Sequence, residues 1–392
     1  MKFNTLFFTL LFLFGLINLF SFITIPQREI FYTLKLISFI LLIIVLIVPT
    51  SDSKKIFYKS NLSIIITMYI WSLVLTVSLF LSSNNLFDGL IIIIGYILLG
   101  FFAFISLPNR YNTAKDYFNI NTTWFLSIAI GLLIAIGLSF IGITERYYID
   151  PQYFRLRYTF SFINANFLGM FCYILIMILL KDVVLKEFKH KKTFIKLLLI
   201  GLILYILMLS DSRTPLYALV IWCGVFTFLM FTKITRLRIM FYWFLLVGTI
   251  LFLINISFNL EIIDQLLSFR LTNWIDLIQR MNRLEWIFGK GIGTLATDLG
   301  VGTYDNSYIS FFVQTGLLGC SALLLLILTI WIKILEIENY KHKTIALATF
   351  YSWMAYSLFE SAFFSIGNLA SIYVWSDLGL LIAIENSKKK DD

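Results

Sequence analysis

The chain has 392 residues, of which 60% are hydrophobic and only 14% are charged, with a formal net charge of +9. A soluble fold of this length does not carry that balance, and apolar runs long enough to cross a bilayer as helices recur along the whole chain. The basic residues lie in short connections between these runs, which favours topology signals over nucleic-acid binding. The sequence therefore predicts an all-α polytopic membrane protein with the lipid bilayer, and no nucleic acid, as a partner.

We expect about twelve spans within a single membrane domain, residues 1–392. The first apolar run is not followed by a small-residue cleavage site, so we interpret it as a span rather than a signal peptide. An even number of spans places both termini on the same side of the membrane. The expected spans are residues 5–24, 31–49, 62–82, 89–108, 121–142, 162–180, 193–210, 214–232, 239–257, 307–332, 344–364 and 369–385.

The basic residues differ in type between the two sets of connections. One set, with the termini, carries 17 Lys and 3 Arg, and the positive-inside rule makes it cytoplasmic: Lys2, Lys54, Lys55, Lys59, Arg110, Lys115, Lys181, Lys186, Lys189, Lys191, Lys192, Lys233, Arg236, Arg238, Lys333, Lys341, Lys343, Lys388, Lys389 and Lys390. The opposite set carries 8 Arg and 1 Lys: Arg28, Arg146, Arg155, Arg157, Arg213, Arg270, Arg280, Arg283 and Lys290.

Arginine outside and lysine inside indicate different tasks. A solvated loop needs only charge, whereas the rigid guanidinium fork suits a phosphate or carboxylate held through two hydrogen bonds. The alternative for any single arginine is that it extends toward lipid headgroups. The outer arginines as a set predict an anion site on the outer face.

One outer connection, residues 258–306, is much longer than the usual loop, and such loops tend to be functional. Apolar residues at three- and four-residue spacings predict helices over 260–287, lying along the membrane surface and carrying Arg270, Trp274, Arg280 and Arg283. Glycines then alternate over 289–293, which allows tight turns and free amides able to hold an anion. Glu285 pairing with one of the arginines is the competing structural explanation.

The loop ends with Asp305, Asn306, Ser307 and Tyr308 at the mouth of the next span. A carboxylate at the start of a helix is often an N-cap, and on local evidence the cap is the favoured reading of Asp305 over a base that faces an acceptor hydroxyl. Arg155 and Arg157 precede the sixth span. Arg213 lies in a short turn where an ion pair with Asp211 is the alternative to a ligand.

Other chemistries have little support. The two histidines lie among lysines in inner loops and the three cysteines lie inside apolar runs, so we expect no metal site, disulfide or cofactor. Two carboxylates fall at membrane depth: Asp377 inside the last span and Glu360 near the outer end of the eleventh. Each is a functional candidate by default, with a hydrogen bond to a neighbouring helix as the alternative.

Four segments together resemble the O-antigen ligase and polymerase superfamily, in particular the Wzy-type polysaccharide polymerases. Residues 157–169 resemble its arginine followed by Asn-Pro-Asn, with Ala165 in the place of the proline. Ser212-Arg213 resembles its Ser-Arg turn. Residues 270–274 and 287–293 resemble its long-loop signature, and residues 305–309 with Gly316 its loop exit. Ligases of the superfamily carry a histidine near the loop exit, where this chain has Asp305-Asn306, so the departure favours a polymerase.

The resemblance implies a GT-C-like, metal-independent glycosyltransferase on the outer face of the bacterial cytoplasmic membrane. It would polymerise oligosaccharide units carried on undecaprenyl diphosphate into capsule or O-antigen, beside a flippase and a chain-length regulator. The residues that would carry this chemistry are, for catalysis, Asp305, Arg270 and Arg283, and, for substrate binding, Arg155, Arg157, Arg213, Arg280, Trp274, Asn306 and Tyr308. Aromatic side chains at the interface would stack on sugar rings, although as membrane anchors they need no ligand.

Three alternatives stay open. A ligase of the same superfamily would move glycan to a lipid or protein acceptor. A flippase or exporter of lipid-linked oligosaccharide would have a similar number of spans, but we would expect charges inside the bundle rather than a large outer loop. A non-catalytic membrane subunit of a glycan assembly complex is the third.

Overall fold

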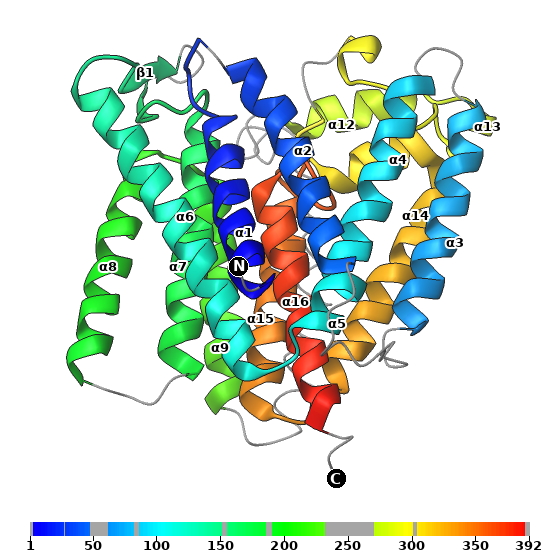
Figure 1. Ribbon diagram of the computed structural model, residues 1–392. Helices are drawn as coiled ribbons and strands as arrows, with labels where there is room; N and C mark the ends of the chain where they lie inside the picture. Colours follow the sequence, from blue (N-terminus) through cyan, green and yellow to red (C-terminus); the bar gives the residue numbers. More distant parts are fainter. Residues whose placement is uncertain are drawn as a thin grey trace.

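The computed structural model is a bundle of helices with a small hairpin and two short helices at one end (Figure 1). It describes residues 3–26, 28–47, 62–81, 86–150, 155–185, 190–231, 270–300 and 304–388. The elements are α1 (Phe3–Phe20), α2 (Arg28–Ile47), α3 (Leu62–Leu81), α4 (Leu86–Phe101), the π-helical turn η2 (Phe102–Ser106), α5 (Leu107–Arg110), α6 (Ala114–Phe140), β1 (Tyr147–Asp150), β2 (Arg155–Tyr158), α7 (Ala165–Leu185), α8 (His190–Leu209), α9 (Arg213–Phe231), α12 (Arg270–Gln279), α13 (Arg283–Phe288), η3 (Thr297–Leu299), α14 (Ser307–Leu335), α15 (Tyr340–Ser357) and α16 (Leu369–Lys388).

The predicted class is confirmed: the chain is an all-α polytopic membrane protein. Within the described residues, eight helices are long and apolar enough to cross a bilayer, and α1 and α16 contain shorter apolar stretches. Apolar side chains also cover the outside of the bundle, because Leu133, Phe80 and Phe231 are 68%, 78% and 83% exposed. Such a surface is stable against lipid, where helices satisfy their own backbone hydrogen bonds. The predicted span over 239–257 lies outside the described residues.

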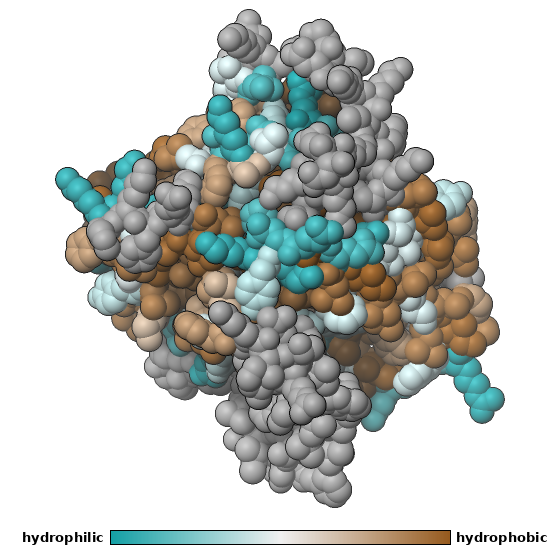
Figure 2. Space-filling view, turned by 90° about the horizontal axis from the view of Figure 1, so that it is seen from below, coloured by the Kyte–Doolittle hydropathy of each residue, from teal (hydrophilic) through white to brown (hydrophobic). Residues whose placement is uncertain are grey.

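We call the end that carries β1, β2, α12 and α13 the upper end, as it stands in Figure 1, and the end where the chain terminates the lower end. The lower end carries exposed lysines at the starts of α8 and α15, among them Lys191, Lys192 and Lys341. Seen from below, hydrophilic side chains form a band across the middle of this face, with apolar surface on both sides (Figure 2). The lower end of the bundle therefore carries a polar band, whereas the sides of the bundle are apolar.

The most buried helices are α7 and α16, whose side chains form the centre of the main core. In contrast, α8 lies at the edge of the bundle, with most of its side chains facing outward. A second, smaller core under the upper-end loop consists of Leu277, Met281, Ala296, Tyr304 and Val313. This second core fixes α12 and the loop after it on the outer part of α14.

The long helix α14 is broken at Gly316, whose φ of 63° and ψ of −163° are not helical. The break leaves the carbonyls of Val313 and Gln314 without their helical partners, and the amides of Lys290 and Gly291 donate to them over 2.8 and 3.0 Å. A Cβ at Gly316 would stand 2.4 Å from the carbonyl oxygen of Ile287, so glycine is needed for this close approach. The expectation of free amides in the glycine run is wrong for these two, because they bind α14.

Candidate active site at the upper end

Arg157 is held where three segments meet. It lies on β2, which pairs antiparallel with β1 so that Arg157 faces Tyr148 across the hairpin. Its Nη1 donates to the Tyr148 hydroxyl at 3.2 Å and its Nη2 to Oδ1 of Asn166 at 2.8 Å. Nε and Nη2 also reach the carbonyls of Ser210 and Asp211 at 3.3 and 3.4 Å, in the turn between α8 and α9. These four acceptors are neutral oxygen atoms, and together they orient the guanidinium group.

Asn166, in the first turn of α7, connects Arg157 to a carboxylate. Its Oδ1 accepts from Arg157 and from the Ser212 hydroxyl, the latter at 3.2 Å, and its Nδ2 donates to Oε1 of Glu360 at 3.1 Å. Glu360 lies in residues 358–368, which we call the α15–α16 segment. The expected eleventh span extended to residue 364, but α15 ends at Ser357, so Glu360 stands in a connection rather than in a helix.

Arg270 and Asp305 approach the same segment from the long loop. Arg270 begins α12, and its Nη1 donates to the carbonyl of Phe359 at 2.6 Å. Its Nε lies 3.7 Å from Oδ2 of Asp305. Trp274, one turn along α12, donates from Nε1 to the carbonyl of Tyr304 at 2.9 Å. The start of α12 is thus fixed against both the loop exit and the α15–α16 segment.

The N-cap of α14 is Asn306, whose Oδ1 accepts from the amides of Tyr308 and Ile309 at 2.8 and 3.1 Å. The capping interpretation of Asp305 is therefore wrong, and its carboxylate faces Arg270 instead. Asp305 has a φ of 46°, in the left-handed region that non-glycine residues rarely adopt. Asp211 has a φ of 49°, also at the upper end, and such strain is found more often at functional sites than elsewhere.

Ser307 fixes the α15–α16 segment to the start of α14. Its hydroxyl donates to the carbonyl of Glu360 at 2.7 Å and accepts from the amides of Ala362 and Phe363 at 3.1 and 3.0 Å. The backbone on both sides of the Glu360 side chain is thereby held in place. Arg157, Asn166, Arg270, Asp305 and Glu360, which we call the upper cluster, come from four separate stretches of the chain.

Burial raises the pKa of Glu360 to about 7. Arg270 and Arg157 oppose this rise by favouring the carboxylate, and the negative charge of Asp305 adds to it. A carboxyl group with such a pKa exchanges a proton readily near neutral pH, which is the property of a general base. The upper cluster therefore combines two oriented guanidinium groups with a carboxylate able to take up a proton.

The other residues predicted for the site are placed differently. Arg213 and Arg283 are exposed at the starts of α9 and α13, and the exposed Arg280 pairs with Asp276 and donates to the carbonyl of Leu299 at 3.0 Å. In the part of the chain that the structure describes, no hydrogen bond or ion pair joins these three to the upper cluster. Glu285 pairs with Lys290 at 2.9 Å rather than with an arginine.

Three predicted residues serve the surrounding framework. Arg155 lies on β2, opposite Asp150 in the hairpin. Tyr308 points into the bundle, where its hydroxyl donates to the carbonyl of Met354 at 3.1 Å, while Asn306 is the cap already described. The sequence analysis included Asn166 only within the resemblance over residues 157–169 and gave it no role of its own, and it named Glu360 only as a carboxylate near a span end. That rule for membrane carboxylates was the signal that could have selected Glu360.

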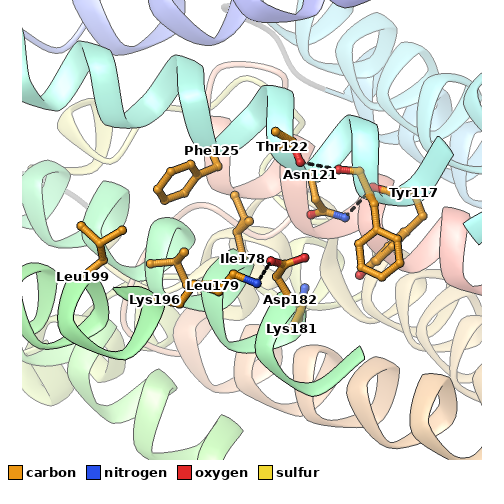
Figure 3. A pocket seen from close by; sticks show the side chains of 11 residues that line it. Tyr117, Asn121, Thr122, Phe125, Ile178, Leu179, Lys181, Asp182, Lys196 and Leu199 are labelled. Atoms are coloured by element: carbon orange, nitrogen blue, oxygen red, sulfur yellow. Dashed lines mark hydrogen bonds and ion pairs between the residues drawn. The ribbon is translucent and has the colours of Figure 1, made fainter. Parts of the chain in front are cut away.

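A second polar cluster lies in the lower half, between α6, α7, α8 and α16. Asp377 accepts from Lys181 at 2.5 Å and from the Tyr117 hydroxyl at 2.9 Å, and both members of the ion pair are almost fully buried. Lys181 was expected in a cytoplasmic loop, which is wrong because α7 continues to Leu185. Figure 3 shows the neighbouring pair of Lys196 and Asp182, on the wall of a cavity of about 220 Å³. Both lysines are paired, so we assign this cluster to helix packing.

Comparison of the chain with models of protein families and with curated proteins gave no match. The likeness to the O-antigen ligase and polymerase superfamily therefore depends on the residues quoted for it, of which Arg157, Asn166, Arg270 and Asp305 belong to the upper cluster.

Proposed function

We propose that this chain is a glycosyltransferase that polymerises lipid-diphosphate-linked oligosaccharide units on the outer face of the bacterial cytoplasmic membrane. The observation that carries the proposal is the upper cluster, which gathers residues of three of the four segments that resemble Wzy-type polymerases. The exposed apolar sides of the bundle suit a substrate whose carrier lipid stays in the bilayer. In this proposal the upper end faces outward and both termini lie in the cytoplasm.

Arg157 and Arg270 would bind the diphosphate of the donor. Each guanidinium is fixed by a carbonyl or amide oxygen, so little side-chain entropy is lost when an anion arrives. A charge held in place before the reaction stabilises the charge that develops on a departing diphosphate. The exposed Arg213, Arg280 and Arg283 would act earlier, by attracting the anionic substrate to the upper end.

Glu360 would serve as the base, with Asp305 keeping Arg270 in position. The acceptor hydroxyl oxygen attacks the anomeric carbon of the donor sugar, and its proton passes to the Glu360 carboxylate. The bond from the anomeric carbon to the diphosphate oxygen breaks, and the diphosphate leaves with the electron pair. Asp305 is the weaker candidate because its carboxylate already faces Arg270 and is 39% exposed.

The test is to delete the gene and determine the length and sidedness of the lipid-linked glycan. Single repeat units stranded on the outer face, without long polymer, are the expected result. Full-length polymer still attached to lipid outside would instead identify a ligase, and units trapped on the cytoplasmic face would identify a flippase.

Complementation refines the test. Glu360→Gln should fail to restore polymer at normal protein levels, whereas the matched change Glu285→Gln, in an exposed capping box of the same end, should restore it. Polymer made by the Glu360→Gln protein at the wild-type level would remove Glu360 from the chemistry.

A further inference from the structure

A cavity of about 250 Å³ lies beside the upper cluster, between α4, the outer part of α14 and the α15–α16 segment. Six of its lining residues are polar and uncharged: Tyr96, Ser307, Ser310, Gln314, Ser361 and Ser365. Phenylalanine and isoleucine side chains with one glycine form the rest of the wall. Among the described residues, the lining holds hydroxyl and amide groups but no Asp, Glu, Lys, Arg or His, in contrast to the charged cavity of the lower half.

Polar groups in this wall have hydrogen-bonding capacity to spare. The hydroxyl of Tyr96 makes no hydrogen bond with any other residue that the structure describes. Ser310 accepts from Nε2 of Gln314 at 3.1 Å, which leaves its own hydroxyl hydrogen available. Within the described residues, Oε1 of Gln314 accepts one long hydrogen bond, 3.5 Å from the amide of Gly293. An occupant with several hydroxyl groups would satisfy these donors and acceptors.

Aromatic rings give the cavity a rigid side. The ring of Tyr96 stacks on that of Trp71, with centroids 5.0 Å apart, and lies near Phe311 and Phe364. Trp71 itself is 1% exposed, so the stack is fixed from behind. Flat apolar surfaces next to hydroxyl groups match a sugar ring, which has both apolar C–H faces and a polar rim.

The cavity adjoins the proposed base through two residues. Ser307 lines the cavity and donates to the carbonyl of Glu360, and Ser361, also in the lining, directly follows Glu360 in the chain. A ring bound here would lie beside the backbone of the segment that carries Glu360. The volume is below the roughly 300–1,000 Å³ of pockets for drug-sized ligands, which suits one ring rather than an oligosaccharide.

We propose that this cavity is a subsite for one uncharged sugar ring of the acceptor repeat unit. The assignment rests on the proposed function. The cavity would bind a sugar of the acceptor, whereas Arg157 and Arg270 would bind the diphosphate of the donor. A phosphate would find no cation among the lining residues that the structure describes. A lipid chain would leave the hydroxyls of Tyr96 and Ser310 unpaired in an apolar contact, which is unfavourable.

Thiol protection tests binding without measuring turnover. The variant carries Ser310→Cys, with Cys172, Cys223 and Cys320 changed to Ala, and is labelled with N-ethylmaleimide. The probe is the repeat-unit oligosaccharide released from the organism's own lipid carrier, at rising concentrations. It should slow labelling about tenfold at ten times its dissociation constant. Thr297→Cys, at the exposed start of η3 and outside the cavity lining, should label at an unchanged rate.

Two results would overturn the subsite. Labelling of the introduced thiol at position 310 that is unaffected by the oligosaccharide would show that no ring binds there. Protection by undecaprenyl phosphate but not by the oligosaccharide would make the cavity a lipid groove.

Kinetics separates this inference from the proposed function. Tyr96→Phe and Ser310→Ala should each raise the KM for the acceptor about 2- to 10-fold, the effect of one lost neutral hydrogen bond, with kcat and the donor KM unchanged. The control is Ser321→Ala. If both variants keep the wild-type acceptor KM while Glu360→Gln stops polymerisation, the subsite is wrong and the function stands. If the wild type forms no polymer, the function is wrong, and thiol protection still decides whether the cavity binds sugar.

Discussion

Asn166 donates to Glu360 over 3.1 Å although 194 residues separate them in the chain. The same side-chain amide accepts from Arg157 at 2.8 Å, so one residue sets the position of both a cation and a carboxylate. Asn166→Ala should therefore lower kcat about tenfold, as expected for the loss of about one hydrogen bond's free energy in the transition state. Steady-state kinetics on purified protein measures this. Asn119→Ala, on the exposed lower part of α6, is the control.

The pH dependence should report on Glu360. Because a base must be ionised, kcat/KM should rise with pH and level off above about 7, the pKa of Glu360. Asp305→Asn removes a negative charge that raises this pKa, so the rising limb should move to lower pH. Arg157→Gln removes a positive charge that lowers the pKa of Glu360. The rising part of the pH profile of kcat/KM, measured on the activity that remains, should therefore move to higher pH. A pH profile of kcat/KM that neither variant shifts would show that a group other than Glu360 titrates.

Arg270, which begins α12, and Arg280, which directly follows its last residue, allow the effects of two Arg→Lys substitutions to be compared. Arg270→Lys loses the guanidinium fork that reaches both Phe359 and Asp305, and should reduce kcat/KM by about 10- to 100-fold. Arg280→Lys changes an exposed pair with Asp276, which contributes only about 0.3–0.5 kcal/mol. Polymer yield and protein level, measured for both variants, distinguish a chemical effect from poor folding. Equal activity of the two variants would contradict the assignment of Arg270.

The pair of Lys181 and Asp377 should govern stability rather than chemistry. Lys181→Met leaves a buried carboxylate without its partner and should lower the free energy of unfolding by about 3–5 kcal/mol. The double variant Lys181→Met with Asp377→Asn removes both charges and should recover most of that loss. Thermal unfolding in detergent measures both, and unchanged stability of the single variant would show that the pair is not formed.

Gly316→Ala tests the break in α14. A Cβ at this positive-φ position would stand 2.4 Å from the Ile287 carbonyl oxygen, so the loop that carries α13 must shift. We expect lower thermal stability and lost polymerisation. Gly201→Ala, in the middle of α8 with nothing within 4 Å, should instead stabilise the protein by about 0.5–1 kcal/mol. The melting temperatures of both variants test this prediction, which expects a decrease for Gly316→Ala and an increase for Gly201→Ala.

Residue type and periodicity were enough to predict the membrane class and the approximate positions of most described helices. They also selected Arg157 and Arg270, because arginines are concentrated in one set of connections, and Asp305, because a carboxylate stands at the exit of the long loop. The same reasoning was wrong for Lys181, since a charge near a span end looks like a loop residue until its partner is known. It also assigned the cap of α14 to Asp305, where two adjacent residues, Asp305 and Asn306, can each cap a helix.

The sequence by itself determined that this chain folds in a membrane, because its apolar runs are too long and too many for a soluble core. It also predicted that most charges lie in connections, although Lys181 lies within α7. Only the tertiary structure decided which of them meet. Glu360 accepts from Asn166, and the neighbouring Phe359 carbonyl accepts from Arg270, because Ser307 holds the α15–α16 segment against α14. Contacts between residues so far apart in the chain depend on how helices pack, and local sequence patterns do not contain that information.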